Sequence, residues 1–146
     1  MLLDTTVYID VLRGRAPPEV ITLLRLRTCN HSSVCLAELT HAFGRLDPGH
    51  PDTKSALAEI RGTIRDDIRP HRLHAPDAEV WASAGMLAGL VSRLRNLAKG
   101  HDHRILNDAM IYLQACKLGC AVLTRNITDF DLLEQLAPMG EVLFYQ

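Results

Sequence analysis

The segment AVLTRNITDF, residues 121–130, shows most directly how this chain folds. Its first four residues are apolar or β-branched and follow Gly119, a pattern typical of a short buried strand. Arg125 and Asn126 then form a polar turn, and a helical pattern runs over Phe130–Leu136. The segment therefore predicts a strand, a turn and a helix in immediate succession.

The beginning of the chain repeats this order. Met1 to Asp4 is a short apolar run that stops at a carboxylate, and the pattern of Val7 to Leu12 predicts a helix that Thr5 or Thr6 would cap. Buried strands that alternate with helices favour a parallel sheet covered by helices on both faces. We therefore expect an α/β fold.

The remaining elements follow from apolar periodicity and from turn residues. Helices are expected over 17–28, 34–43, 52–68, 76–94 and 105–118, a weak strand over 70–73 and a last strand over 142–145. Ser32 or Ser33 is the natural cap of the helix that carries Glu38, and Gly119 closes the helix that carries Asp108. Residues 100–104 are expected to form a polar loop.

Length and composition bound the class of protein. The 146 residues suit a single domain, 1–146, and 47% hydrophobic with 23% charged residues is an ordinary globular composition. The longest mostly apolar stretch, 82–91, is too short to span a bilayer, and no signal-peptide pattern opens the sequence, so a cytoplasmic protein is expected. The four cysteines lack zinc-site spacing, so we expect reduced core thiols.

The net charge of −1 is low for a protein that binds nucleic acid. Arginines and lysines nevertheless fall in clusters, several of them close in sequence to acidic residues: Arg13, Arg15, Arg25, Arg27, Arg93, Arg95, Lys99, Arg104 and Arg125. These clusters fit a basic rim around an acidic pocket, and they fit solvated helix faces equally well.

Four acidic residues carry the chemistry that the sequence suggests: Asp4, Glu38, Asp108 and Asp129. Each stands where a strand or helix edge meets a turn, which is where an α/β sheet presents side chains at its carboxyl edge. Carboxylates gathered in one cleft repel each other unless a cation neutralises them, so convergence implies Mg²⁺ or Mn²⁺. Taken singly, Asp4 also fits a helix N-cap, Glu38 an arginine partner and Asp108 a favourable first-turn acid.

A metal-dependent nuclease is the reaction class that follows. We expect Asp4 and Asp108 to bind metal directly, Glu38 to bind metal or orient water, and Asp129 to act through water or a second metal. His101 and His103 are weaker candidates for binding a metal, and binding of RNA phosphates is the alternative role for them. The sequence contains no glycine-rich phosphate loop or dinucleotide fingerprint, so no nucleotide cofactor is implied.

Four blocks of this sequence resemble PIN-domain ribonucleases, in particular the VapC-type toxins of toxin–antitoxin pairs. The blocks are Leu2 to Asp10, Ser32 to Leu39, Asn107 to Ile111 and Val122 to Phe130. The resemblance implies a PIN-like three-layer α/β/α sandwich with a central parallel sheet, Mg²⁺- or Mn²⁺-dependent cleavage of RNA, a small antitoxin partner and a homodimer.

The resemblance also assigns site residues. Asp4, Glu38 and Asp108 match the first three acids of the family site, and either Asn126 or Asp129 matches the fourth. Thr6 and Thr124 match small polar residues near that site. The leading alternative is a PIN-fold module that binds RNA or protein without hydrolysis; a phosphoryl-transfer receiver or phosphatase is disfavoured because its paired acids and later lysine are missing.

Overall fold

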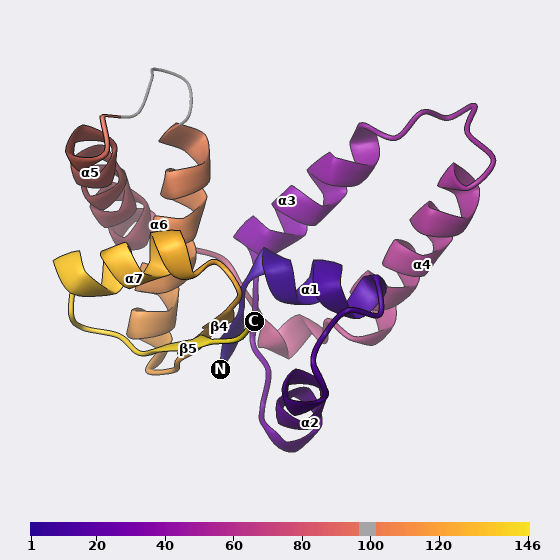
Figure 1. Cartoon of the computed structure of the whole chain (residues 1–146), viewed down its shortest axis with the longest axis horizontal. Helices are drawn as coiled ribbons and strands as arrows, with labels where there is room; N and C mark the ends of the chain where they lie inside the picture. Colours follow the sequence, from indigo (N-terminus) through magenta and orange to yellow (C-terminus); the bar gives the residue numbers. More distant parts are fainter. Residues whose placement is uncertain (97–101) are drawn as a thin grey trace.

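The computed structural model describes residues 1–96 and 102–146 and contains short strands embedded among helices (Figure 1). The strands are β1 (Leu2–Leu3), β2 (His31–Ser32), β3 (Leu73–His74), β4 (Val122–Thr124) and β5 (Val142–Phe144). The helices are α1 (Thr5–Leu12), α2 (Pro18–Leu26), α3 (Ser33–Gly44), α4 (Thr53–Asp66), α5 (Ala78–Leu94), α6 (Asp102–Leu118) and α7 (Ile127–Leu136), with a 3₁₀ turn η1 (Pro70–Arg72).

All strand pairs in the described residues are parallel. One sheet has the order β1-β4-β5, with Leu2 opposite Val122 and Val122 opposite Val142, and a second sheet pairs β2 with β3. A parallel bridge between Leu2 and Asn30 connects the two sheets next to β1. The carboxyl ends of β1 and β4 therefore meet at one edge, which places Asp4 beside the turn after Thr124.

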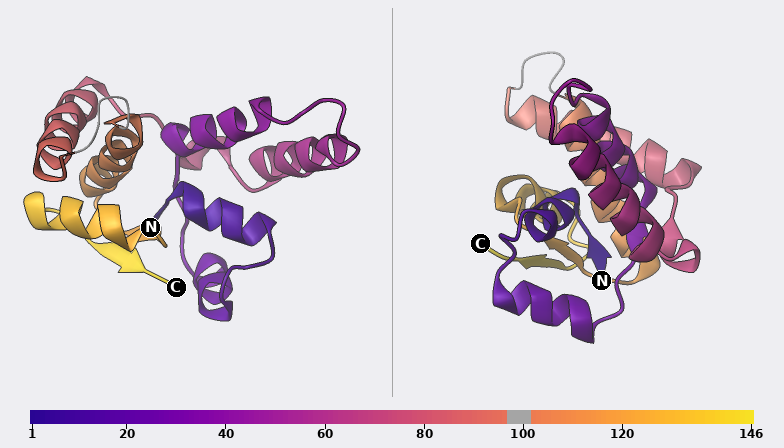
Figure 2. Two further views of the ribbon diagram at one scale, coloured as in Figure 1. Left: turned by 45° about the horizontal axis from the view of Figure 1, so that its top comes forward. Right: turned by 90° about the vertical axis from the view of Figure 1, so that its right-hand side faces the viewer.

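Helices cover the strands from both sides. In Figure 1 the strands lie at the centre, with α5, α6 and α7 to one side and α1 to α4 to the other. The shared core includes Tyr112 and Ile111 of α6, Phe130 of α7 and Leu123 of β4, all essentially inaccessible to solvent. The views in Figures 1 and 2 show α3 and α4 projecting together away from the strands. The expected α/β class with a central parallel sheet is confirmed.

Three local expectations were wrong. Helix α6 begins at Asp102, not after the expected loop; His103 and Arg104, which precede the apolar stripe that starts at Ile105, are polar and exposed and gave no helical pattern. Asp108 consequently lies beyond the first turn of its helix, so the alternative that it is a first-turn acid stabilised by the helix dipole does not apply. The weak strand expected over 70–73 is the 3₁₀ turn η1 followed by β3, and β2 was not expected at all.

Several smaller expectations are also settled. All four cysteines are free, although only Cys35 is fully buried. Gly119 ends α6 with a φ of 62°, in the left-handed region that favours glycine. His103 is exposed on α6, whereas His101 and Lys99 lie outside the described residues. No helix in the described part of the chain is long and apolar enough to cross a bilayer.

Candidate active site

Asp4 lies between β1 and α1 and is 3% exposed. Its carboxylate accepts hydrogen bonds from the backbone N–H groups of Thr5 at 2.7 Å and Thr6 at 3.4 Å, so Asp4 is itself the N-cap of α1, and the prediction of a threonine cap was wrong. The hydroxyls of Thr6, at 2.6 Å, and Thr124, at 2.7 Å, also donate to Oδ2. Capping thus fixes the carboxylate at the sheet edge without removing it from the site.

Glu38 faces the same region from α3. Its Oε2 accepts a hydrogen bond from the Thr5 hydroxyl, and its Oε1 accepts one from Nδ2 of Asn107 at 2.7 Å. Glu38 thereby connects α1 and α6. Its partners in the described residues are a hydroxyl and an amide, so the alternative of an arginine partner has no support there.

Asn126 joins the two remaining acids. Its side-chain N–H group donates to Oδ2 of Asp108 at 3.1 Å and to Oδ2 of Asp129 at 2.8 Å. Its Oδ1 accepts from the Asp129 backbone N–H, which makes Asn126 the N-cap of α7. Arg95 forms an ion pair with Asp129 and also donates to the Thr128 carbonyl. Both candidates for the fourth position, Asn126 and Asp129, therefore lie at the site.

The electrostatics of Asp108 show that the four acids share one region. Burial raises the pKa of Asp108 well above its usual range, and the nearby charges of Asp4, Asp129 and Glu38 raise it further. The pKa of the buried Cys35 thiol is also raised, first by burial and then by Asp4. The structure therefore brings together all four acids singled out from the sequence.

This set of side chains fits a hard divalent cation chemically. The donors are carboxylate oxygens, which Mg²⁺ and Mn²⁺ prefer, and a cation would offset the repulsion that raises the pKa of Asp108. Among the described residues, no three histidine, cysteine, aspartate or glutamate side chains already stand as a metal cluster. The acids accept hydrogen bonds instead from threonine, asparagine and arginine donors.

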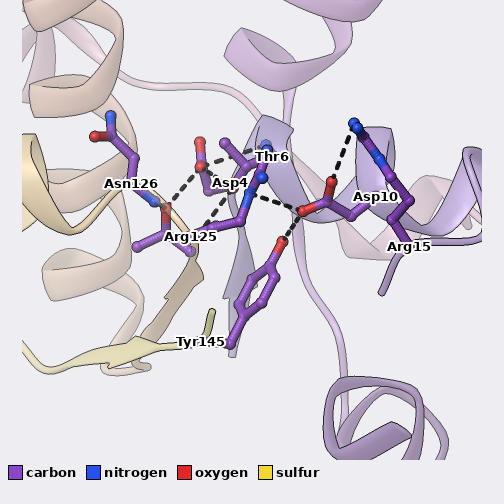
Figure 3. Close-up of polar contacts among 8 residues, drawn as sticks. Asp4, Thr6, Asp10, Arg15, Arg125, Asn126 and Tyr145 are labelled. Atoms are coloured by element: carbon purple, nitrogen blue, oxygen red, sulfur yellow. Dashed lines mark hydrogen bonds and ion pairs between the residues drawn. The ribbon is translucent and has the colours of Figure 1, made fainter. Parts of the chain in front are cut away.

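A further acid, Asp10 of α1, is buried close to this site and was missed from the sequence. It is 2% exposed and accepts a hydrogen bond from the Tyr145 hydroxyl at 3.0 Å (Figure 3). Nε of Arg125 lies 3.0 Å from Oδ2, and Arg15 lies 3.7 Å from Oδ1. The signal was present in the sequence, since Asp10 is a charged residue between Ile9 and Val11 in a short apolar helix. The partners Thr5, Asn107 and Arg95 carried no comparable signal.

No protein-family model matches this chain, and neither does any curated protein. Solved structures do match it over nearly its full length. A chain of VapBC2 from Rickettsia felis, bound to a promoter DNA fragment, superposes with a TM-score of 0.67 and 17% identity, covering 99% of this chain and 98% of that one. DNA-bound VapBC from Salmonella typhimurium gives 0.69 and 20%, covering 98% and 96%.

A third match is VapBC-5 from Mycobacterium tuberculosis, described as a member of the VapBC family of toxin–antitoxin systems. Its TM-score is 0.63 at 20% identity, with 99% of this chain and 97% of that chain covered. Similarity at this level of identity establishes the fold. The chain has the PIN-like α/β/α fold expected from its sequence, and in particular the fold found in these VapBC complexes.

Proposed function

We propose that this protein is a metal-dependent endoribonuclease and the toxin component of a type II toxin–antitoxin system. The observation that carries the proposal is the hydrogen-bonded arrangement of the four acids: Asn126 bonds both the buried Asp108 and Asp129, and Thr5 bonds both Asp4 and Glu38. Burial, and then the charges of Asp4, Asp129 and Glu38, raise the pKa of Asp108. Such a cluster is costly to maintain unless it serves a cation. The fold shared with VapBC complexes supports the same reaction class and an antitoxin partner.

Asp4, Glu38 and Asp108 are the residues that would hold Mg²⁺ or Mn²⁺, with Asp129 contributing through water or a second ion. A bound divalent ion would supply activation of water and stabilisation of charge at phosphorus. Thr6 and Thr124 orient Asp4 by donating to its Oδ2. Asn107 orients Glu38, which would direct the attacking water. Asn126 orients both Asp108 and Asp129.

The raised pKa of Asp108 bears on the pH dependence of the proposed reaction. Because its pKa is raised, the carboxyl holds a proton more firmly than an ordinary aspartate does. Occupation of the site by a cation would favour release of that proton and expose a second carboxylate oxygen as a ligand. Metal binding and RNA cleavage should therefore both strengthen as the pH rises. We further propose that the protein acts in the cytoplasm as a homodimer.

Cleavage of RNA by the purified chain, freed of any partner, tests the proposal. With single-stranded RNA and Mn²⁺ we expect endonucleolytic products that chelator abolishes. Asp108→Asn should lower the rate by at least about a hundredfold, since it removes a proposed direct ligand. Asp131→Asn is the matched control, because Asp131 is an exposed acid of α7 that accepts a hydrogen bond from Gln135 on the same helix. Cleavage that is undiminished in chelator would refute the metal mechanism.

A second candidate function is binding of RNA or protein without hydrolysis. The pairing of Asp129 with Arg95 favours it, because an arginine already neutralises one of the four acids. Mn²⁺ titration by calorimetry separates the two candidates. A nuclease should bind Mn²⁺, and this binding should depend on Asp108. A pure binding module should not need the metal, so its affinity for RNA should be equal with Mn²⁺ and with chelator.

A further inference from the structure

Two arginines gather on the buried Asp10 carboxylate. Arg125 comes from the turn after β4 and Arg15 from the segment after α1, and they approach different oxygens of Asp10 (Figure 3). Their side chains are 46% and 54% exposed, whereas that of Asp10 is 3% exposed. The carboxylate is therefore internal, and the two guanidinium groups extend to the surface.

The cluster carries a net positive charge, since one carboxylate faces two guanidinium groups that remain charged at any physiological pH. Each guanidinium has five N–H donors, and few of them are bonded to Asp10. The 3.7 Å contact to Arg15 is longer than a hydrogen bond, and Oδ1 of Asp10 has no hydrogen-bond partner among the described residues. Asp10 thus holds the two charges together while leaving donors for another anion.

The cluster is attached directly to the candidate site. The backbone N–H of Arg125 donates to the Thr6 hydroxyl at 3.1 Å, and that hydroxyl donates to Asp4. The residues on either side of Arg125 are Thr124, which bonds Asp4, and Asn126, which bonds Asp108. An anion bound by the arginines would therefore lie beside the site at a fixed orientation.

A polyanionic substrate needs such an anchor, because four acids at the site repel RNA. We propose that Arg15 and Arg125, held together by Asp10, form a phosphate-binding subsite for the RNA backbone next to the phosphate that is cleaved. The subsite rests on the proposed function for its substrate. It acts on RNA binding and register, and it contributes no ligand to the metal.

The test measures RNA affinity and cleavage separately. Binding of a short fluorescein-labelled single-stranded RNA is followed by anisotropy in chelator, between about 50 and 200 mM salt. Initial cleavage rates in Mn²⁺ give KM and kcat for the same RNA. The variants are Arg15→Gln and Arg125→Gln, with Arg125→Lys to restore the charge. Arg15→Gln keeps the test valid if loss of Arg125 perturbs folding, because Arg15 is the more exposed and the more loosely held of the two.

Each glutamine variant should weaken RNA binding and raise KM by roughly threefold, and should lower the slope of log K against log salt by about 0.7. The change should fall on KM rather than kcat, and Arg125→Lys should recover the slope. Arg65→Gln is the matched control: it removes the same charge from an exposed arginine paired with Asp66, and the slope should not change. Tyr145→Phe removes an uncharged donor from Asp10 and should also leave the slope unchanged.

The outcomes distinguish the subsite from the reaction. Arginine-dependent RNA binding without any cleavage in Mn²⁺ would defeat the proposed hydrolysis and keep the subsite. Cleavage with the parental KM and salt slope in both glutamine variants would overturn the subsite and keep the hydrolysis. Tyr145→Phe matching the arginine variants would also overturn it, because the cluster would then be a structural support. A protein that neither binds nor cleaves RNA overturns both.

Discussion

Replacing Asn126 by aspartate tests whether the acids of the candidate site share one electrostatic environment. The Asn126 amide donates to Asp108 at 3.1 Å and to Asp129 at 2.8 Å. Asn126→Asp leaves the size of the side chain almost unchanged, but it removes both donated hydrogen bonds and places a third carboxylate against the other two. The variant should be destabilised without metal and rescued by it.

The size of the effect follows from the two contacts that are lost. A hydrogen bond to a charged group contributes about 1.5–3 kcal/mol, so the loss of two gives roughly 3 kcal/mol at the lower end. Two unit charges 4 Å apart repel by about 4 kcal/mol at an effective dielectric constant of 20, but a proton taken up by one carboxyl relieves most of that. We expect the free energy of unfolding in chelator at pH 8 to fall by about 3 kcal/mol.

Urea denaturation with and without Mn²⁺ provides the assay. A ligand at a hundred times its Kd stabilises the native state by about 2.7 kcal/mol, and Asn126→Asp should gain more from Mn²⁺ than the parent does because the added carboxylate strengthens the site. Lower pH should also reduce the difference from the parent, since a protonated carboxyl can again donate a hydrogen bond.

The control for this variant is Gln135→Glu. Gln135 donates to Asp131 at 2.8 Å on the exposed surface of α7, so the same amide-to-acid change occurs there in solvent. It should cost only a few tenths of a kcal/mol and should not respond to Mn²⁺. If Asn126→Asp in chelator is as stable as the parent, or if its loss of stability is the same with Mn²⁺, the argument for a shared acidic site is refuted.

Three further predictions concern stability. Asp108→Asn should stabilise the metal-free protein, because burial and the neighbouring acids raise the pKa of Asp108 in the native state. The parent should therefore lose stability as the pH rises from the ordinary aspartate pKa of about 3.9 through that raised value, and urea midpoints measured across this range should show no such loss in the variant. Gly140→Ala should lower the free energy of unfolding, measured by urea denaturation, by about 1–3 kcal/mol, because the added methyl group would lie 2.6 Å from the Cys116 sulfur. Gly85→Ala has open space within α5 and should raise it by up to about 1 kcal/mol, so equal effects of the two substitutions would contradict the packing. Tyr8→Phe removes the buried 2.6 Å hydrogen bond between the Tyr8 hydroxyl and Nδ1 of His31 and should lower the free energy of unfolding by about 1 kcal/mol at pH 8, and a neutral result would show that this bond contributes nothing.

The sequence predicted those parts of the fold that depend on local pattern. The apolar runs before Asp4 and before Arg125 indicated β1 and β4, and because neighbouring parallel strands end at the same edge, the meeting of Asp4 with the turn after Thr124 followed. The positions of Glu38 and Asp108 on helices were also correct. These inferences needed only the periodicity of side chains and the direction of the strands.

The missed features depend on how helices rotate and pack. Glu38 meets Asn107 only because α3 and α6 pack side by side, a contact that no local pattern specifies. The strand β2 is two residues long and polar, too short for periodicity, and its His31 is stabilised by Tyr8. The charges of Asp10 and Arg125 gave no indication of their pairing, because 115 positions of sequence separate the two residues.

The contacts between distant parts of the chain have a consequence for synthesis on the ribosome. Thr124 bonds Asp4 across 120 positions, and Tyr145 bonds Asp10 across 135. A nascent chain that has exposed Asp4 and Glu38 still lacks Asp108 and every residue that orients it, so long-range closure is among the last events of folding. The proposed ribonuclease site would therefore be assembled only after Asp108 and Asn126 have been synthesised, which would delay any attack on the messenger being translated.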